Sequence, residues 1–210
     1  MTDTTVIVVR HGETEWNREH RMQGQRDSSL SALGRVQARR LAERLKATPF
    51  HALYVSDLQR AIDTARAVVE LAPVEPVVDP QLRERAFGIF EGLTAEDMKA
   101  RYPDEYARFK TRDPDYAVPD GESARAFHQR VIAWYESMAR RHPGETVVTV
   151  THGQVLASLF RHAQGIDLAA PRSFELYNAG LNTFVRDAAG WRAAAMNDIR
   201  HLGDDALTWA

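Results

Sequence analysis

The sequence predicts an α/β protein in which helices cover both faces of a mostly parallel sheet, a three-layer α/β/α sandwich. Runs of β-branched apolar residues, which are typical of buried strands, occur at 6–9 and 146–150. Amphipathic stretches typical of helices separate the strand-like runs, and this alternation favours parallel pairing. The 210 residues are 44% hydrophobic, enough for one sizeable core, so we expect a single domain over residues 1–210.

The first half of the chain alternates between strand-like and helix-like segments. The predicted elements are a strand at 6–9, a polar loop at 16–27, a helix at 35–46, a strand at 52–56, a helix from 57 and a short strand at 77–78. Pro49 ends the first helix. Ser56 or Asp57 can cap the second helix, because short polar side chains bond the free N–H groups of a first turn.

The second half contains one segment without a regular pattern and then returns to helices and strands. The predicted elements are an ordered loop at 82–92, a helix-favouring stretch at 94–112, turns at 114–121, helices at 123–141 and 154–162, a strand at 146–150, and edge strands at 174–177, 181–186 and 192–196. Residues 93–121 are charged and rich in Tyr and Phe, so we expect them to form a lid or insert over the edge of the sheet.

The composition excludes several classes of protein. The net charge of −2 gives no reason to expect nucleic-acid or membrane-surface binding, so any basic site must be local. The chain has no cysteine, which excludes disulfides, thiolate metal sites and a cysteine nucleophile. Residues 1–9 lack the basic and apolar regions of a secretion signal, and no apolar run approaches a membrane span. We therefore expect a cytoplasmic protein; the composition does not indicate its oligomeric state.

Two strand-like runs end in the same way, with a histidine followed by a glycine. Arg10 and His11 follow the first run, and His152 follows the strand at 146–150. Because the carboxyl ends of parallel strands meet at one edge of a sheet, these side chains should lie close together. Arg60, in the first turn of a predicted helix, would join them. Several charge-assisted donors at one edge predict a phosphate site.

Seven short motifs then carry a resemblance to a known family. They are RHGETEWN at 10–17, SDLQR at 56–60, LRE at 82–84, FG at 87–88, EG at 91–92, GES at 121–123 and THG at 151–153. In this order, over nearly the whole chain, they resemble the histidine phosphatase superfamily, the phosphoglycerate mutase-like group.

The resemblance implies a role for each motif residue. His11 would be the nucleophile that forms a phosphohistidine, through a neutral ring whose second nitrogen is held by an acceptor. Glu84 would be the general acid and then the base. The implied catalytic residues are Arg10, His11, Arg60, Glu84 and His152, and the implied substrate-binding residues are Asn17, Gln23, Gly24 and Gly153.

The residues alone are also compatible with purely structural roles for some of these positions. Glu84 lies between two arginines and is compatible with a surface ion pair. Asn17 is compatible with the cap of a turn, and Gln23 with Gly24 is compatible with a plain turn.

The resemblance implies a phosphatase that hydrolyses a small phosphomonoester, with no metal and no cofactor, and no metal-binding or nucleotide-binding motif occurs in the sequence. One alternative is a phosphoglycerate mutase that uses 2,3-bisphosphoglycerate as primer. Residues 93–121 lack the adjacent arginines of the family's true mutases, and their aromatic residues favour a less polar substrate. The other alternative is a non-catalytic phosphate-binding scaffold, which would need neither a nucleophile nor an acid.

Overall fold

A computed structural model describes residues 2–72 and 74–203 of the chain. The strands are β1 (Thr4–Arg10), β2 (Ala52–Val55), β3 (Pro76–Val78), β4 (Thr146–Thr151), β5 (Leu181–Asp187) and β6 (Gly190–Asp198). The helices are α1 (Glu15–Arg18), α2 (Ala32–Lys46), α3 (Gln59–Leu71), α4 (Ala95–Arg101), α5 (Pro103–Lys110), α6 (Ala124–Arg141) and α7 (Gly153–Gln164). Of two single 3₁₀ turns, η2 (Gly88–Phe90) lies inside the segment predicted to be an ordered loop, and η1 (Pro80–Leu82) ends at the first residue of that segment.

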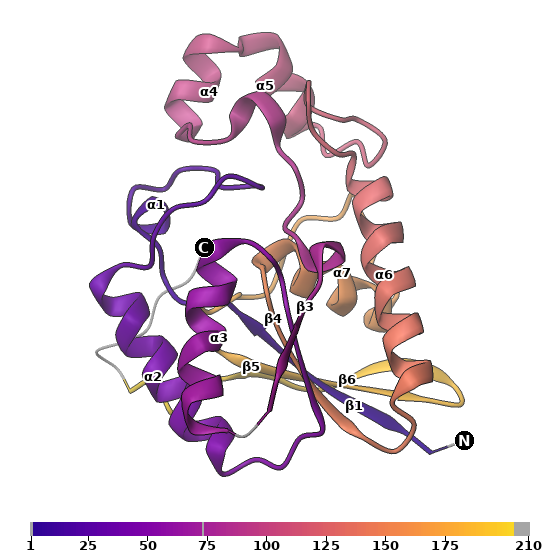
Figure 1. The fold of residues 1–210 in the computed structure, drawn as a ribbon. Helices are drawn as coiled ribbons and strands as arrows, with labels where there is room; N and C mark the ends of the chain where they lie inside the picture. The colour runs from indigo at the N-terminus through magenta and orange to yellow at the C-terminus, as the bar shows by residue number, and fades with distance from the viewer. Residues whose placement is uncertain (1, 73, 204–210) are drawn as a thin grey trace.

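The strands form one sheet with the order β3-β2-β4-β1-β5-β6. The first four strands of this order run parallel, and β5 and β6 are antiparallel. Figure 1 shows α2 and α3 on one side of the sheet and α6 and α7 on the other. The predicted α/β/α sandwich with a mostly parallel sheet is therefore confirmed.

The side chains of β1 alternate between the two faces, as the pleat of a strand requires. Val6 and Val8 pack in a core with residues of α6 and α7. Ile7 and Val9 pack in a second core with residues of α2 and α3. Because both faces are covered, the position of β1 beside β4 is well determined, and Arg10 pairs with Thr151 at their carboxyl ends.

A third, smaller core lies beyond the carboxyl edge of the sheet. Phe87 and Phe90 pack there with Met98 of α4 and with Tyr116 and Val118. The predicted helix-favouring stretch is divided into α4 and α5, because a proline, whose ring favours a first helical turn, opens α5. Figure 1 shows α4 and α5 at the top of the molecule, above the edge at which β1 and β4 end. A lid function for residues 93–121 stays a prediction.

The strand predicted at 174–177 is wrong. This segment is a loop in which only Tyr177 forms an isolated bridge. Its alternating apolar residues pack on a helix instead of joining the sheet, since the ring of Phe174 lies 4.4 Å from that of Phe160 in α7. The backbone carbonyl of Leu176 in this loop accepts a hydrogen bond from the side chain of Arg10. Among residues 2–72 and 74–203, no helix is both long and apolar enough to cross a bilayer.

Candidate active site

A cavity of about 140 Å³ opens at the carboxyl ends of β1 and β4. Eight of the nine predicted site residues line it: Arg10, His11, Asn17, Gln23, Gly24, Arg60, Glu84 and Gly153. The ninth, His152, lies fully buried with its ring centroid 5.3 Å from that of His11. The backbone N–H of His11 donates to the backbone carbonyl of Thr151 at 2.9 Å, and this bond holds the two strand ends together. The structure thus brings the predicted residues to one place.

The ring of His11 is held in one orientation and one tautomer. Its Nδ1 lies 2.7 Å from the carbonyl oxygen of Gly12. A carbonyl oxygen only accepts, so Nδ1 carries the hydrogen and Nε2 keeps a lone pair. Burial, followed by the charges of Arg60 and Arg10, holds the pKa of His11 well below its usual value. The arrangement therefore offers a neutral imidazole with a nucleophilic Nε2.

Arg10 places a fixed cation beside this ring. Its Nη1 donates to the carbonyl of Leu176 at 2.7 Å, in the segment that does not form a strand. Its buried Nε has no hydrogen-bond partner in the described chain. Burial lowers the pKa of Arg10 to about 10, which still leaves the guanidinium charged at neutral pH. One N–H of a charged, immobilised group therefore remains for a ligand.

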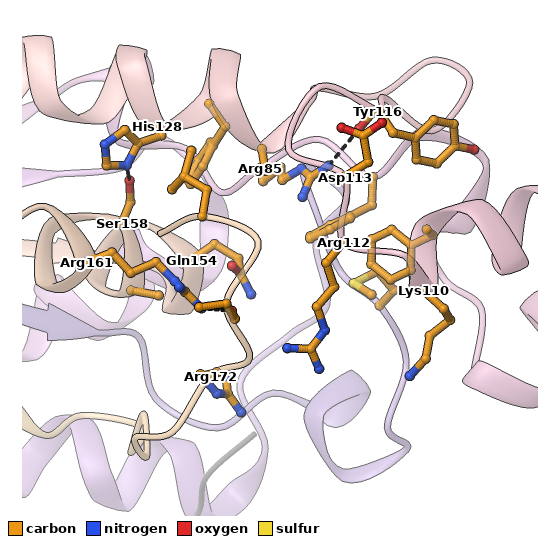
Figure 2. A pocket seen from close by; sticks show the side chains of 18 residues that line it. Arg85, Lys110, Arg112, Asp113, Tyr116, His128, Gln154, Ser158, Arg161 and Arg172 are labelled. Atoms are coloured by element: carbon orange, nitrogen blue, oxygen red, sulfur yellow. Dashed lines mark hydrogen bonds between the residues drawn. The ribbon is translucent and has the colours of Figure 1, made fainter. Parts of the chain in front are cut away.

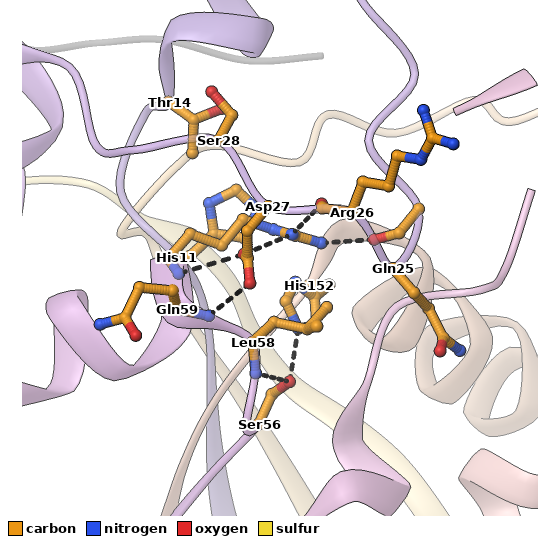
Figure 3. Close-up of polar contacts among 12 residues, drawn as sticks. His11, Thr14, Gln25, Arg26, Asp27, Ser28, Ser56, Leu58, Gln59 and His152 are labelled. Carbon is orange, nitrogen blue, oxygen red and sulfur yellow. Dashed lines mark hydrogen bonds and ion pairs between the residues drawn. The ribbon is translucent and has the colours of Figure 1, made fainter. Parts of the chain in front are cut away.

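Arg60 is 1% exposed and is anchored by Asp27. The Arg60 Nη1 lies 3.0 Å from the Asp27 carboxylate, and Nη2 donates to the carbonyl of Gly24 at 2.7 Å. The buried Nε of Arg60, like that of Arg10, lacks a partner among described residues. The same carboxylate accepts the N–H of Gln59 at 2.8 Å, at the start of α3 (Figure 3).

The prediction that Ser56 or Asp57 caps this helix is wrong, because Asp27 accepts the N–H of Gln59 in its first turn. Asp57 instead pairs with Arg83 at 2.5 Å, and the α3 N-cap side chain makes no capping bond. An aspartate from a distant loop replaces the local cap and also compensates the charge of Arg60.

His152 is held by Ser56. Its Nε2 lies 2.7 Å from Ser56 Oγ, which also accepts the N–H of Leu58 at 3.3 Å (Figure 3). The buried Nδ1 of His152 has no partner within the described residues. Burial, followed by the charge of Arg60, holds the pKa of His152 well below its usual value. If the Ser56 hydroxyl donates to Nε2, the neutral ring presents Nδ1–H as a further donor.

Glu84 is buried, 9% exposed, and does not form the surface ion pair that its arginine neighbours suggested. Its Oε1 accepts the N–H of Arg85 at 2.7 Å, and its Oε2 accepts the N–H of Gln154 at 3.1 Å. Burial outweighs these bonds and raises the pKa of Glu84. A carboxyl group that holds its proton beside a nucleophile can serve as a general acid.

A family comparison agrees with this geometry. The family model described as "Histidine phosphatase superfamily (branch 1)" matches residues 6–199. The chain belongs to the histidine phosphatase superfamily.

Curated relatives of this histidine phosphatase align along most of its length. "Phosphoglycerate mutase-like protein 4" of Arabidopsis thaliana is 35% identical over 201 residues, which cover 94% of this chain and 86% of the relative. "Metal-independent phosphoserine phosphatase" of Arabidopsis thaliana is 35% identical over 202 residues, 95% of this chain and 83% of the relative. The solved structure titled "Bacillus stearothermophilus YhfR" superimposes with a TM-score of 0.85 at 35% identity, covering 94% of this chain and 98% of that one.

The remaining predicted positions of this histidine phosphatase shape the cavity. Gly24 has a φ of +56°, and a Cβ there would lie 2.0 Å from Oε1 of Glu91. Asn17 lines the cavity, and its Oδ1 accepts the N–H of Thr14 at 3.1 Å, as the cap interpretation expects. Substrate binding by Asn17 stays a prediction. Gln23 has a buried Oε1 without a partner in the described part of the protein.

Sequence reasoning missed three residues that complete the site. They are Asp27, Arg172 and Gln154, whose N–H bonds Glu84. Two of them lie in loops where no periodic pattern marks them, and Gln154 contributes only its backbone.

The contact between Ser56 and His152 gives a first testable expectation. Ser56→Ala removes the hydroxyl that fixes the His152 tautomer, so we expect kcat/KM to fall about tenfold, the loss typical of a positioning partner. The inhibition constant of vanadate should rise with it, whereas the melting temperature alone would move if Ser56 were merely structural. Ser137→Ala on α6 makes the same substitution as a control. Unchanged vanadate affinity in Ser56→Ala would contradict the role.

Proposed function

We propose that this protein is a metal-independent phosphatase that hydrolyses a small phosphomonoester through a phosphohistidine on His11. One observation carries the proposal: a neutral His11 shares its cavity with Arg10 and Arg60 and packs against His152, and one buried nitrogen of each of these three residues has no partner within the described protein. These nitrogens suit the oxygens of a phosphoryl group, which needs several donors in a site of low dielectric.

The proposed reaction has two steps. Nε2 of His11 attacks phosphorus in line, the ester P–O bond breaks, and the leaving oxygen takes the bonding pair and a proton from Glu84. Water then attacks the phosphohistidine and gives a proton to the Glu84 carboxylate, while the P–N bond breaks and its electron pair returns to Nε2. Inorganic phosphate leaves and both residues regain their first state. Arg10, Arg60 and His152 stabilise the moving charge.

The absence of a metal requirement is a further testable expectation. The described residues contain no group of three or more His, Asp or Glu side chains able to hold an ion, and a curated relative is named a metal-independent phosphatase. Phosphate release from an aryl phosphate should therefore stay within about twofold in excess chelator, because the positive charge comes from arginines. Loss of activity that only an added divalent ion restores would refute the metal-free reaction.

The same assay separates the phosphatase from its alternatives. With 3-phosphoglycerate, with and without 2,3-bisphosphoglycerate, a phosphatase releases inorganic phosphate, whereas a mutase forms 2-phosphoglycerate. Binding of phosphate without turnover of any ester would favour a scaffold. The cytoplasmic location also stays a prediction.

A further inference from the structure

The segment that carries Glu84 lies outside regular secondary structure. Residues 83–86 form neither a helix nor a strand, and they follow the turn η1. A backbone without helix or strand bonds needs other partners for its polar groups, and those partners decide where its side chains point. The position of the proposed general acid therefore depends on the residues that bond this segment.

Arg130 of α6 bonds the backbone on one side of Glu84. Its Nη1 donates to the carbonyl of Gln81 at 2.7 Å and to the carbonyl of Arg83 at 3.2 Å. Its guanidinium lies over the buried ring of Phe127, with 5.0 Å between Cζ and the ring centroid. An arginine that rests on the core thus holds two carbonyls of the backbone before the acid.

Glu122 bonds the backbone on the other side of Glu84. Its Oε2 accepts the N–H of Ala86 at 3.0 Å, and its own N–H donates to the carbonyl of Ala86 at 2.9 Å. The carboxylate also pairs with Arg130, whose Nη2 lies 2.9 Å from Oε2 and whose Nε lies 3.1 Å from Oε1. A two-point pair of this kind is strong and directional. Glu122 and Arg130 together form a clamp that holds the backbone before and after Glu84.

The clamp also explains the GES motif at 121–123, which contributes no residue to the catalytic cavity. A Cβ at Gly121 would lie 2.8 Å from the carbonyl oxygen of Ala86, so glycine allows the two backbones to approach this closely. Glu122 is one half of the clamp. Ser123 caps α6, the helix that carries the other half. All three residues of the motif therefore support the same segment.

Arg85 connects Glu84 directly to the clamp. Its backbone N–H donates to Oε1 of Glu84 at 2.7 Å. Its side chain donates from Nε to the backbone carbonyl of Glu122 at 2.9 Å. The same side chain donates from Nη2 to the backbone carbonyl of Tyr116 at 3.4 Å (Figure 2). The residue whose N–H orients the acid is thus fixed to the backbone of Glu122.

We propose that Glu122 and Arg130 are positioning residues for the general acid, because their ion pair fixes the irregular backbone that aims the carboxyl group of Glu84 at the leaving oxygen. This inference rests on the proposed phosphatase function. Neither residue lines the catalytic cavity. Loss of the clamp should therefore impair proton transfer to the leaving group and spare the binding of the phosphoryl group.

Arg130→Gln and Glu122→Gln break the clamp from its two ends, so that the second variant carries the test if the first does not fold. In each variant we expect kcat/KM for an alkyl phosphate to fall about tenfold, because a small displacement of a catalytic group has a large effect on rate. For a nitrophenyl phosphate, whose phenolate leaves without a proton, the fall should stay within about threefold. The inhibition constant of vanadate should also stay within about threefold, since the phosphoryl donors are untouched.

The double variant Arg130→Gln/Glu84→Gln separates positioning from general structural damage. Losses from independent sites multiply, whereas losses that act through one residue do not. With the alkyl phosphate, the double variant should therefore stay within about twofold of Glu84→Gln alone.

The pH profile gives an independent readout of the same role. Burial raises the pKa of Glu84, while its two backbone N–H bonds and the charges of Arg60 and Arg10 oppose the rise. A segment that is no longer clamped admits water to the carboxyl group and weakens the effect of burial. The fall of kcat/KM at alkaline pH, where Glu84 loses its proton, should therefore begin at lower pH in Arg130→Gln.

Arg186→Gln is the matched control. Arg186 also pairs with a glutamate of α6, Glu136, at 3.1 Å, and also donates to a backbone carbonyl. It lies opposite Thr4 at the start of β1, at the end of this strand far from the catalytic cavity. The control should keep the wild-type ratio of kcat/KM between the two esters.

Two results would overturn the positioning role while leaving the phosphatase intact. One is an equal loss for both esters in the two clamp variants. The other is a double variant whose loss is the product of the two single losses. If the wild-type protein released no phosphate from either ester, the phosphatase proposal would fail and the positioning role with it.

Discussion

His11→Ala is expected to lower phosphate release by at least about 10⁴-fold, since the loss of an enzyme's nucleophile removes the covalent route entirely. The wild-type protein should form a phosphoenzyme that is labile in acid, as the P–N bond of a phosphohistidine is, and the variant should form none. Both are measured with a labelled ester, by quenching early and counting protein-bound phosphate.

A second histidine provides the control for this substitution. His51 is exposed and precedes β2, at the opposite edge of the sheet from the catalytic cavity. His51→Ala should keep wild-type turnover and labelling. A His11→Ala variant that retains more than about a hundredth of the activity would show that another group attacks phosphorus.

Glu84→Gln is expected to cost about 10²- to 10⁴-fold in kcat/KM, the usual contribution of a general acid. The glutamine keeps the shape of the side chain, and its single oxygen can accept one of the two N–H groups, those of Arg85 and Gln154, that bond Glu84. The loss should be larger for an alkyl phosphate than for a nitrophenyl phosphate, because a stable phenolate leaves without a proton. Glu70→Gln, at the exposed end of α3, is the control.

The pH dependence gives Glu84→Gln a second readout. In the proposed reaction the active forms are protonated Glu84 and neutral His11. Burial raises the pKa of Glu84 above the usual value of a glutamate, so kcat/KM should fall only as pH rises through that raised pKa. The pKa of His11 lies well below 6.5, so the acidic fall should occur far below that pH. The variant should lose the alkaline fall. An unchanged alkaline fall would remove Glu84 from the role of acid.

Local patterns and one topological rule were enough to predict the centre of the site. The β-branched apolar runs of β1 and β4 identify buried strands, and each strand is followed by a histidine and a glycine. Parallel neighbours carry their carboxyl ends to one edge, which places His11 and His152 together. These inferences need no knowledge of contacts between distant segments.

Contacts between distant segments account for what the sequence did not reveal. Asp27 caps a helix that begins 32 residues later, and Ser56 meets a histidine 96 residues away. The segment at 174–177 has the alternation of an edge strand, but its packing on α7 decides its structure. A cavity of about 490 Å³ beside the catalytic one likewise brings together four arginines from separate segments of the chain, Arg85, Arg112, Arg161 and Arg172.

The pairing of Arg10 with Thr151 makes turnover a stringent reporter of correct folding. Successive residues of a strand point to opposite faces, so a slip of one residue between β1 and β4 would exchange their inward and outward side chains. His11 and His152 would then no longer meet. A misregistered sheet would retain strand content by circular dichroism yet lack all catalysis, so recovery of phosphate release during refolding counts only chains whose strands are aligned as in the native protein.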